Sequence, residues 1–151
     1  RGVFDVASQP KLDALLPLSD VLSLHIPLNA HTRGLFDAAR LALLPRGAIV
    51  VNTARGEVID EPALVAALQS GALFAAGLDT MAVEPLPAGS ALAALPNVVL
   101  TPHVGGSTPA ALEGMATGAA RNVLGFLTGQ RLDPISCVNP QVLTQNERNI
   151  A

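Results

Sequence analysis

Three ionisable side chains, Arg55, Glu84 and His103, are of the types that hold a carboxylate and move a proton. Arg55 stands shortly after the apolar run 48–52, and a guanidinium in a concave site binds a carboxylate through two parallel hydrogen bonds. An imidazole such as that of His103 exchanges protons near neutral pH. A carboxylate such as that of Glu84 fixes the imidazole tautomer by accepting its hydrogen bond. Taken alone, Arg55 and Glu84 are better explained as surface residues, and the glycines that follow His103 suit an ordinary turn equally well. The joint position of the three residues therefore decides the interpretation.

Alternating strands and helices are expected to position these side chains. Short apolar runs predict strands over Val21–Leu24, Ala48–Asn52, Phe74–Leu78 and Val98–Leu100. Helical spacing predicts helices over Leu35–Leu44, over the segment that Asp60 caps and Gly71 ends, and over Pro109–Thr128. Strands separated by helices favour right-handed crossovers and a parallel sheet.

Polar residues follow the apolar runs at the points where the predicted strands end. Ligands of a parallel sheet bind outside the carboxyl ends of its strands, so residues at those ends are expected to converge on one crevice. The residues in question are His25, Thr53–Arg55, Asp79 and His103. This shared location is a stronger indication of a site than any single motif.

The composition is that of a chain with a packed core. At 151 residues, with 50% hydrophobic and 14% charged residues, the chain can form one cored domain and disorder is disfavoured. A net charge of −3 without a basic cluster argues against nucleic acid as a partner. Mean hydropathy is +0.44, but the apolar runs are far shorter than the roughly 20 residues of a membrane-spanning helix, so no membrane partner is expected.

Cysteine and histidine usage narrows the chemistry further. Cys137 is the only cysteine, which excludes an internal disulfide and fits a reducing compartment. The histidines His25, His31 and His103 do not have the spacing of metal ligands, and we predict no metal site. The expected location is the cytoplasm.

The ordered motifs of the chain resemble those of the D-isomer-specific 2-hydroxyacid dehydrogenase family over most of its length. The segments that carry the resemblance are Ser23–Leu28, Arg46–Gly56, Val58–Glu61, Gly77–Asp79, Glu84-Pro85 and Thr101–Thr108. The pair Thr80-Met81 departs from the pattern, because the family more often has Val-Phe there. This departure concerns local packing and not the chemistry.

The resemblance implies an α/β fold, namely the C-terminal part of a Rossmann-type parallel sheet domain and a long helix returning to a substrate domain. Residues 1–106 would be the second half of an NAD(P)-binding domain. Residues 107–151 would be the crossover helix and the C-terminal segment of the substrate domain. No Gly-x-Gly occurs in the sequence, so the family's phosphate-binding loop is missing. The chain is therefore expected to be a portion of a longer enzyme and to be inactive alone.

The resemblance also implies a role for each site residue. Arg55 would bind the substrate carboxylate and carbonyl, His103 would be the acid/base at the carbonyl oxygen, and Glu84 would pair with His103. Contacts with a nicotinamide cofactor are implied for His25, Ile26, Pro27, Thr53, Ala54, Arg55, Asp79, His103, Gly105 and Gly106. The family's ribose-reading residue is not in the sequence, so NAD is expected and NADP stays open.

The implied activity is hydride transfer between the cofactor and a small D-2-hydroxy acid or 2-oxo acid. Phosphoglycerate, hydroxypyruvate and glyoxylate types stay open as substrates, and the segments Ser107-Thr108 and Cys137–Asn139 favour the phosphoglycerate type. A homodimer is expected. An alternative is an NAD(H)-sensing, corepressor-like binding protein of the same fold. Such proteins keep the same three residues, so the motifs do not separate the two functions.

Overall fold

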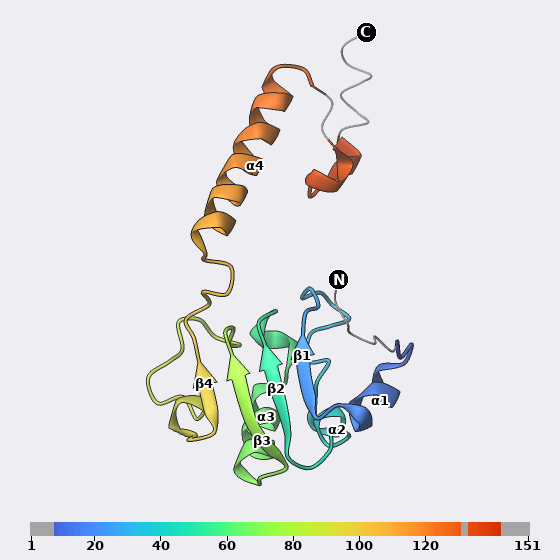
Figure 1. Cartoon of the computed structure of the whole chain (residues 1–151), viewed down its shortest axis with the longest axis vertical. Helices are drawn as coiled ribbons and strands as arrows, with labels where there is room; N and C mark the ends of the chain where they lie inside the picture. The colour runs from blue at the N-terminus through green and yellow to red at the C-terminus, as the bar shows by residue number, and fades with distance from the viewer. Residues whose placement is uncertain (1–7, 131–132, 143–151) are drawn as a thin grey trace, which may run out of the picture. The chain divides into compact units, whose positions relative to one another are not determined.

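Four parallel strands form the sheet that carries the predicted site, and they lie in sequence order in the computed structural model (Figure 1). The strands are β1 (Val21–Leu24), β2 (Ala48–Asn52), β3 (Leu73–Leu78) and β4 (Val98–Leu100). The structure describes residues 8–130 and 133–142. It has two units, of which the first ends at Gly105 and the second begins at Gly106. The predicted α/β class with a parallel sheet is confirmed.

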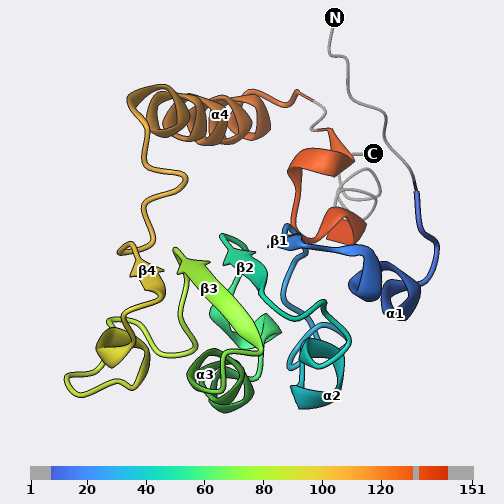
Figure 2. The ribbon, with the colours of Figure 1, turned by 60° about the horizontal axis from the view of Figure 1, so that its bottom comes forward.

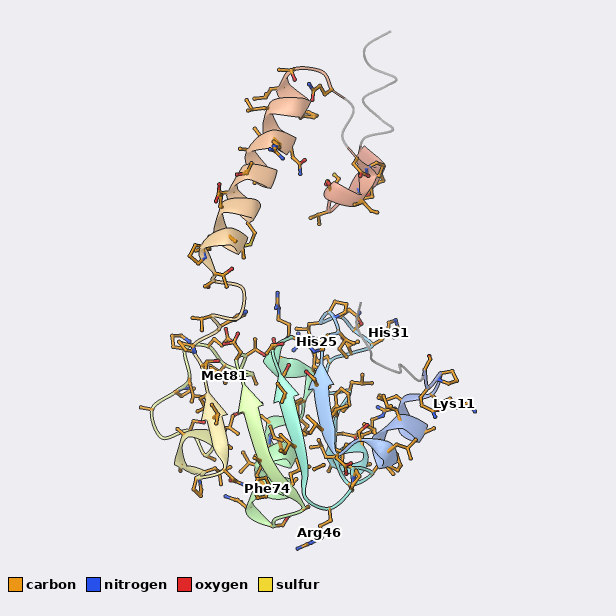
Figure 3. The ribbon with its side chains drawn as sticks, in the orientation of Figure 1. Lys11, His25, His31, Arg46, Phe74 and Met81 are labelled. Atoms are coloured by element: carbon orange, nitrogen blue, oxygen red, sulfur yellow. The ribbon has the colours of Figure 1, made fainter. Side chains whose placement is uncertain are left out.

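The register of the sheet aligns the carboxyl ends of its strands. Leu24 pairs with Asn52, Asn52 with Leu78, and Leu78 with Leu100. The residues that follow stand in one row at one edge of the sheet: His25, Thr53, Asp79 and Thr101. Figure 3 shows His25 and Met81 at this edge and Phe74 and Arg46 at the opposite one. The predicted alignment of these strand ends is present.

Short helices precede the first strand and connect the strands that follow. They are α1 (Leu12–Leu15), α2 (Ala38–Leu41) and α3 (Glu61–Gln69), and the short 3₁₀ turns are η1 (Leu16–Leu18), η2 (Gly56–Val58) and η3 (Leu92–Ala94). The two helices α2 and α3 lie on the same face of the sheet (Figure 2). As predicted, Asp60 caps α3 by accepting a hydrogen bond from the amide of Ala63 at 3.0 Å. Gly71 follows α3 with a φ of 68°, which glycine adopts without strain.

The predicted helix over Leu35–Leu44 is wrong in extent. Only Ala38–Leu41 is α-helical, and Phe36 instead pairs with Ile59 in an isolated parallel bridge. Asp37 begins the helix by accepting a hydrogen bond from the amide of Arg40 at 2.9 Å. Because Asp37 caps the helix, the residues before it are extended. Leu35 and Phe36 are apolar because they pack against the core, and not because they belong to the helix.

One apolar core unites the sheet with its helices. Its buried side chains come from β1, β2 and β3 and from one face of α3. They include Leu22, Leu24, Val50, Leu64, Leu68, Leu73 and Leu78. Alternate residues of β1 and β2 are buried, as expected for strands with one face against helices. The polar residues Asn52, Asp79 and Thr80 are also buried, and they lie at strand ends beside the predicted site.

The described part of the second unit contains a long helix and two short turns. The helix α4 (Pro109–Leu127) begins at Thr108, whose hydroxyl accepts a hydrogen bond from the amide of Ala111 at 3.2 Å. The turns η4 (Pro134–Ser136) and η5 (Pro140–Val142) follow. Across the described ranges, no helix is long and apolar enough to cross a membrane.

Candidate active site

The loop after β2 places Arg55 at the edge of the sheet where the strands end. Asn52 is 1% exposed, and its side chain holds this loop at two points. Its amide nitrogen donates to the carbonyl oxygen of Arg55 at 2.9 Å, and its carbonyl oxygen accepts from the amide of Ala54 at 3.0 Å. Among the described residues, the guanidinium of Arg55 donates to the neighbouring carbonyl oxygen of Ala54. No described carboxylate lies within salt-bridge distance of Arg55, so its charge is available to an anionic ligand.

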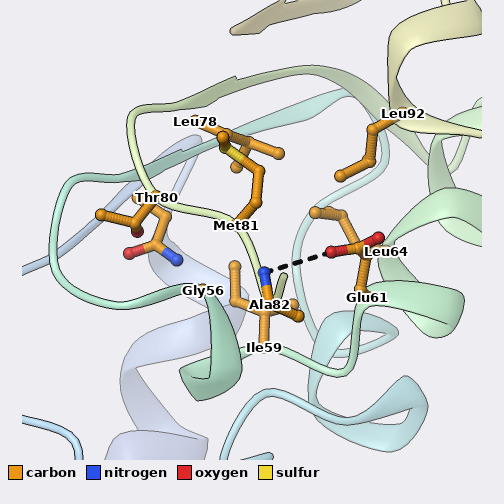
Figure 4. A pocket seen from close by; sticks show the side chains of 10 residues that line it. Gly56, Ile59, Glu61, Leu64, Leu78, Thr80, Met81, Ala82 and Leu92 are labelled. Atoms are coloured by element: carbon orange, nitrogen blue, oxygen red, sulfur yellow. Dashed lines mark hydrogen bonds between the residues drawn. The ribbon is translucent and has the colours of Figure 1, made fainter. Parts of the chain in front are cut away.

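Gly56 lets this loop lie directly against the loop that follows β3. A Cβ atom added at Gly56 would stand 1.9 Å from the carbonyl carbon of Met81 and 2.3 Å from the amide nitrogen of Ala82. Figure 4 shows this approach, together with the hydrogen bond of 3.3 Å from the amide of Ala82 to Glu61. Only glycine permits two backbones to pass this closely. The contact couples the position of Arg55 to the loop that carries Glu84.

Glu84 and His103 form the predicted pair. Nδ1 of His103 lies 2.8 Å from Oε2 of Glu84, and Oε1 of Glu84 accepts a hydrogen bond from the amide of Met81 at 2.9 Å. The hydrogen bond from His103 and then that from Met81 lower the pKa of Glu84 from its ordinary 4.5. Burial acts in the opposite direction, and the charge of Arg55 adds a smaller lowering.

The ionised state of Glu84 defines the tautomer of His103. An ionised carboxylate only accepts hydrogen bonds, so Nδ1 of His103 must carry the proton that is shared with Glu84. The other ring nitrogen, Nε2, is then the one that takes up or releases a proton. This arrangement is the one that a general acid/base requires.

The backbone around His103 is unusual. His103 has a φ of 54°, the left-handed region that non-glycine residues seldom adopt. The carboxylate of Asp79 accepts hydrogen bonds from the hydroxyl of Thr101, from the amide of Val104 at 3.0 Å and from the amide of Gly105 at 2.8 Å. Asp79 thus holds the segment on both sides of His103.

A cleft of about 570 Å³ adjoins the Glu84–His103 pair. Its remaining lining is mostly apolar and comes from Met81, Pro85, Leu86, Leu100, Thr101 and Pro102. An apolar cleft with a few convergent polar groups is the usual form of a small-molecule site. The side chains of His103 and Glu84 are 43% and 35% exposed, so both remain accessible.

The other predicted cofactor residues lie along the same row of strand ends. His25 follows β1 and is hydrogen-bonded to the hydroxyl of Ser23 at 2.8 Å, while Ile26 packs against the core and Pro27 is exposed. Thr53 is exposed and Ala54 half-buried. A Cβ added at Gly106 would meet no atom within 4 Å, so a ligand could approach the backbone there.

The strand ends present groups that fit a nicotinamide cofactor. Among the described residues, Oδ2 of Asp79 accepts one hydrogen bond, from the amide of Gly105, and one acceptor position of this oxygen is left over. Thr53, Ala54, Gly105 and Gly106 would hold such a group through backbone atoms. Over residues 8–130 and 133–142, no cluster of histidine, cysteine or acidic side chains could hold a metal ion.

Two residues that position the site were not identified from the sequence. The sequence pattern places Asn52 at the end of a strand and gives it no further role, although an asparagine that ends an apolar run is a signal for a loop-holding side chain. Gly56 was noted only as part of a motif. Its contact with Met81 joins loops that are distant in the sequence, so no local pattern reveals it.

Comparisons with known proteins identify relatives of this fold and site. The family model described as "D-isomer specific 2-hydroxyacid dehydrogenase, NAD binding domain" matches residues 4–105. A glyoxylate/hydroxypyruvate reductase B from Citrobacter koseri is 47% identical over 131 residues, which are 87% of this chain and 40% of that protein. The chain therefore spans less than half the length of this relative.

Solved structures of similar proteins agree in fold. The D-isomer specific 2-hydroxyacid dehydrogenase from Xanthobacter autotrophicus, in complex with NADPH and MES, matches with a TM-score of 0.73 and 42% identity, over 87% of this chain and 53% of that chain. The D-lactate dehydrogenase with NAD+ from Lactobacillus jensenii matches with a TM-score of 0.73 and 33% identity, over 84% of this chain and 45% of that chain.

Proposed function

The chain belongs to the D-isomer specific 2-hydroxyacid dehydrogenase family, and we propose that it supplies the acid/base half of a dehydrogenase site. The reaction is hydride transfer between a nicotinamide cofactor and a small 2-hydroxy acid or its 2-oxo counterpart. The observation that carries the proposal is the pair of His103 and Glu84 at 2.8 Å, beside a cleft and on the same edge of the sheet as Arg55. The relatives reported above are dehydrogenases and reductases, which gives no support to the corepressor alternative.

The chain's own residues account for substrate binding and proton transfer. A nicotinamide cofactor, when bound, supplies the hydride. The guanidinium of Arg55 binds the substrate carboxylate and polarises the adjacent carbonyl. Nε2 of protonated His103 donates its proton to the carbonyl oxygen as that oxygen gains negative charge during reduction. Glu84 holds Nδ1 and stabilises the imidazolium form before the proton is transferred.

The substrate proposed first is glyoxylate or hydroxypyruvate. The similar reductase from Citrobacter koseri carries these substrates in its name, and both are small 2-oxo acids whose carboxylate Arg55 could bind. Both NAD and NADP are proposed as cofactors to test, because one similar structure holds NADPH and another NAD+. We further propose that residues 1–106 act as half of the cofactor domain and 107–151 as a connection to a substrate domain. The working form is expected to be a cytoplasmic homodimer.

The test is oxidation of NADH and NADPH by the full-length protein that carries this chain, with glyoxylate and with hydroxypyruvate. We expect His103→Ala to lower kcat by roughly 10²–10⁴-fold, the usual contribution of a general acid. Arg55→Ala is expected to raise KM for the oxo acid as well as to lower kcat. The controls His31→Ala and Arg46→Ala change the same residue types outside the site. Undiminished turnover in His103→Ala would overturn the proposal.

The isolated chain of 151 residues provides a second test. We expect it neither to bind NADH tightly nor to turn over, because its sequence contains no glycine-rich phosphate-binding loop. Calorimetric titration with NADH checks this expectation, and micromolar binding would contradict it.

A further inference from the structure

Asp79 is the buried carboxylate of the site, and among the described residues the hydrogen bonds of its side chain all go to residues 101–105. It is 7% exposed, and its partners are the hydroxyl of Thr101 and the amides of Val104 and Gly105. These donors flank His103 on both sides. A buried carboxylate whose hydrogen bonds all go to one short loop fixes the backbone of that loop strongly, because charged hydrogen bonds are about twice as strong as neutral ones.

His103 needs such a restraint. Its backbone lies in the left-handed region, and its amide donates to the carbonyl oxygen of Thr101 at 3.0 Å, which closes a tight turn. This conformation is unfavourable for a side chain with a Cβ and persists only where the surroundings impose it. The hydrogen bond between Glu84 and His103 involves the ring and not the backbone of His103, so it does not impose the backbone conformation. Asp79 is hydrogen-bonded to Thr101, two positions before His103, and to Val104 directly after it, and it can therefore impose this conformation.

Gly105 shows how closely the carboxylate fits this loop. A Cβ atom added at Gly105 would stand 2.9 Å from Oδ2 of Asp79 and 3.7 Å from its carboxyl carbon. A larger residue at this position would push the carboxylate out of reach of the amides. The short hydrogen bond from Gly105 thus depends on the absence of a side chain there.

We propose that Asp79 is a positioning residue, which fixes residues 101–105 in the conformation that aims the His103 imidazole at the reacting carbonyl oxygen. The role is separate from the cofactor contact expected of Asp79, since one acceptor position of Oδ2 stays available. Its kinetic consequence rests on the proposed dehydrogenase function, whereas its structural consequence does not.

The first experiment measures the loop directly, without turnover. Asp79→Asn keeps the size of the side chain but replaces an acceptor with a donor that faces the loop amides. The amides of Val104 and Gly105 bind different oxygens of Asp79, so we expect at least one of them to lose protection against hydrogen exchange. The resonances of the His103 ring should shift, while the amides of β2 keep their protection. The matched control Asp37→Asn alters a helix cap away from the site and should leave all these signals unchanged. Unchanged protection at Val104 and Gly105 in Asp79→Asn would overturn the proposal.

The second experiment measures steady-state kinetics in the full-length protein. A misplacement of about 1 Å can lower the rate roughly 10²-fold, so kcat should fall by up to this factor while KM for the cofactor changes less. Thr101→Ala should lower kcat in the same direction, and Thr101→Ser, which keeps the hydroxyl, should restore it. A raised KM for the cofactor with unchanged kcat would assign Asp79 to cofactor binding alone. Absence of activity in the wild type would refute the proposed function, and the exchange experiment would still decide the positioning role.

Discussion

The loops that carry Arg55 and His103 leave the same edge of one sheet, yet they are held in different ways. The Arg55 loop is held by Asn52, a neutral side chain only three positions away. The His103 loop is held by two carboxylates, Asp79 and Glu84, that are 26 positions before Gly105 and 19 before His103. The first restraint is local and uncharged, and the second is long-range and charged.

This difference matches what each loop is proposed to do. The Arg55 guanidinium has to keep its charge free for a substrate, and a neutral amide fixes the loop without neutralising that charge. The imidazole of His103 has to hold one tautomer and tolerate a positive charge, and carboxylates serve both needs. In each loop, the side chain that holds the backbone thus has a charge compatible with the proposed role of the residue it positions: neutral beside Arg55 and negative beside His103.

Among the side chains that hold the two loops, Glu84 is expected to have the largest effect when its charge is removed. Glu84→Gln keeps the shape of the side chain but removes the charge that stabilises protonated His103. Loss of a charged hydrogen bond of about 1.5–3 kcal/mol corresponds to a fall in kcat of roughly tenfold to a hundredfold. The free energy of unfolding should change little. The side chains of His103 and Glu84 are both more than a third exposed, so solvent screens the pair.

Steady-state kinetics and urea unfolding of the same protein check this prediction. The control Glu57→Gln removes a carboxylate that pairs with Arg33 at 3.6 Å, outside the proposed site. A large loss of stability in Glu84→Gln without loss of kcat would show that the pair is structural.

Gly56→Ala should push the Arg55 loop away from the loop that carries Glu84 and should lower the stability of the protein. The added methyl group would stand 1.9 Å from the carbonyl carbon of Met81, so the backbone has to move. Overpacking of this kind typically costs about 1–3 kcal/mol. The matched control Gly118→Ala lies in α4 with no atom within 4 Å of the added Cβ, and it should stabilise the helix by roughly 0.5–1 kcal/mol. Thermal unfolding measures both variants, and equal stability in the two would contradict the close approach.

The pH dependence of stability should distinguish the charged restraint from the neutral one. The hydroxyl of Thr101 and then the amide of Val104 lower the pKa of Asp79 from its ordinary 3.8, although burial opposes them. Near that pH the unfolded chain binds more protons than the folded one. The stabilisation by Asp79 is therefore complete above pH 3.8 and is lost as the pH falls through the lowered pKa. Glu84, with its pKa lowered from 4.5, acts in the same direction.

Urea unfolding at a series of pH values tests this contrast. Asp79→Asn should flatten the loss of stability in acid. Asn52→Ala should lower stability by about 1–3 kcal/mol, because it leaves two backbone groups of the Arg55 loop unpaired, and by the same amount at every pH. An acid profile that Asp79→Asn leaves unchanged would contradict the assigned role of its charge.

Thr80→Val should have the smallest effect and the opposite sign. Thr80 is 1% exposed, and its hydroxyl is the buried side-chain group of the described residues that lacks a hydrogen-bond partner. Valine has nearly the same shape without the unpaired hydroxyl, so we expect a gain of about 1 kcal/mol with unchanged activity. The control Thr128→Val removes a hydroxyl that donates to Leu124 at 2.8 Å and should bring no gain. Thermal unfolding measures both, and a loss of stability in Thr80→Val would show that its hydroxyl has a partner.

Local patterns in the sequence predicted the four strands, their parallel arrangement and the caps of α3, because strand runs and caps depend on residues close together in the chain. They also predicted that His25, Arg55, Asp79 and His103 follow strand ends, since the carboxyl ends of parallel strands share one edge. The false extension of α2 to Leu35–Leu44 shows the limit of such patterns. There the backbone of Phe36 pairs with Ile59, and that partner is not visible in the spacing.

The tertiary structure decided how the site is held. The contacts of Asp79 with Val104 and Gly105, of Glu84 with His103 and of Gly56 with Met81 all join segments from different loops. Each depends on where two loops end after the sheet has formed, and residue types alone do not specify that. The family motifs in the sequence indicated Arg55, Glu84 and His103 as the residues expected to bind the substrate and transfer the proton. The contacts of Asn52, Gly56 and Asp79, which hold the loops that carry those groups, became visible only once the loops were packed together.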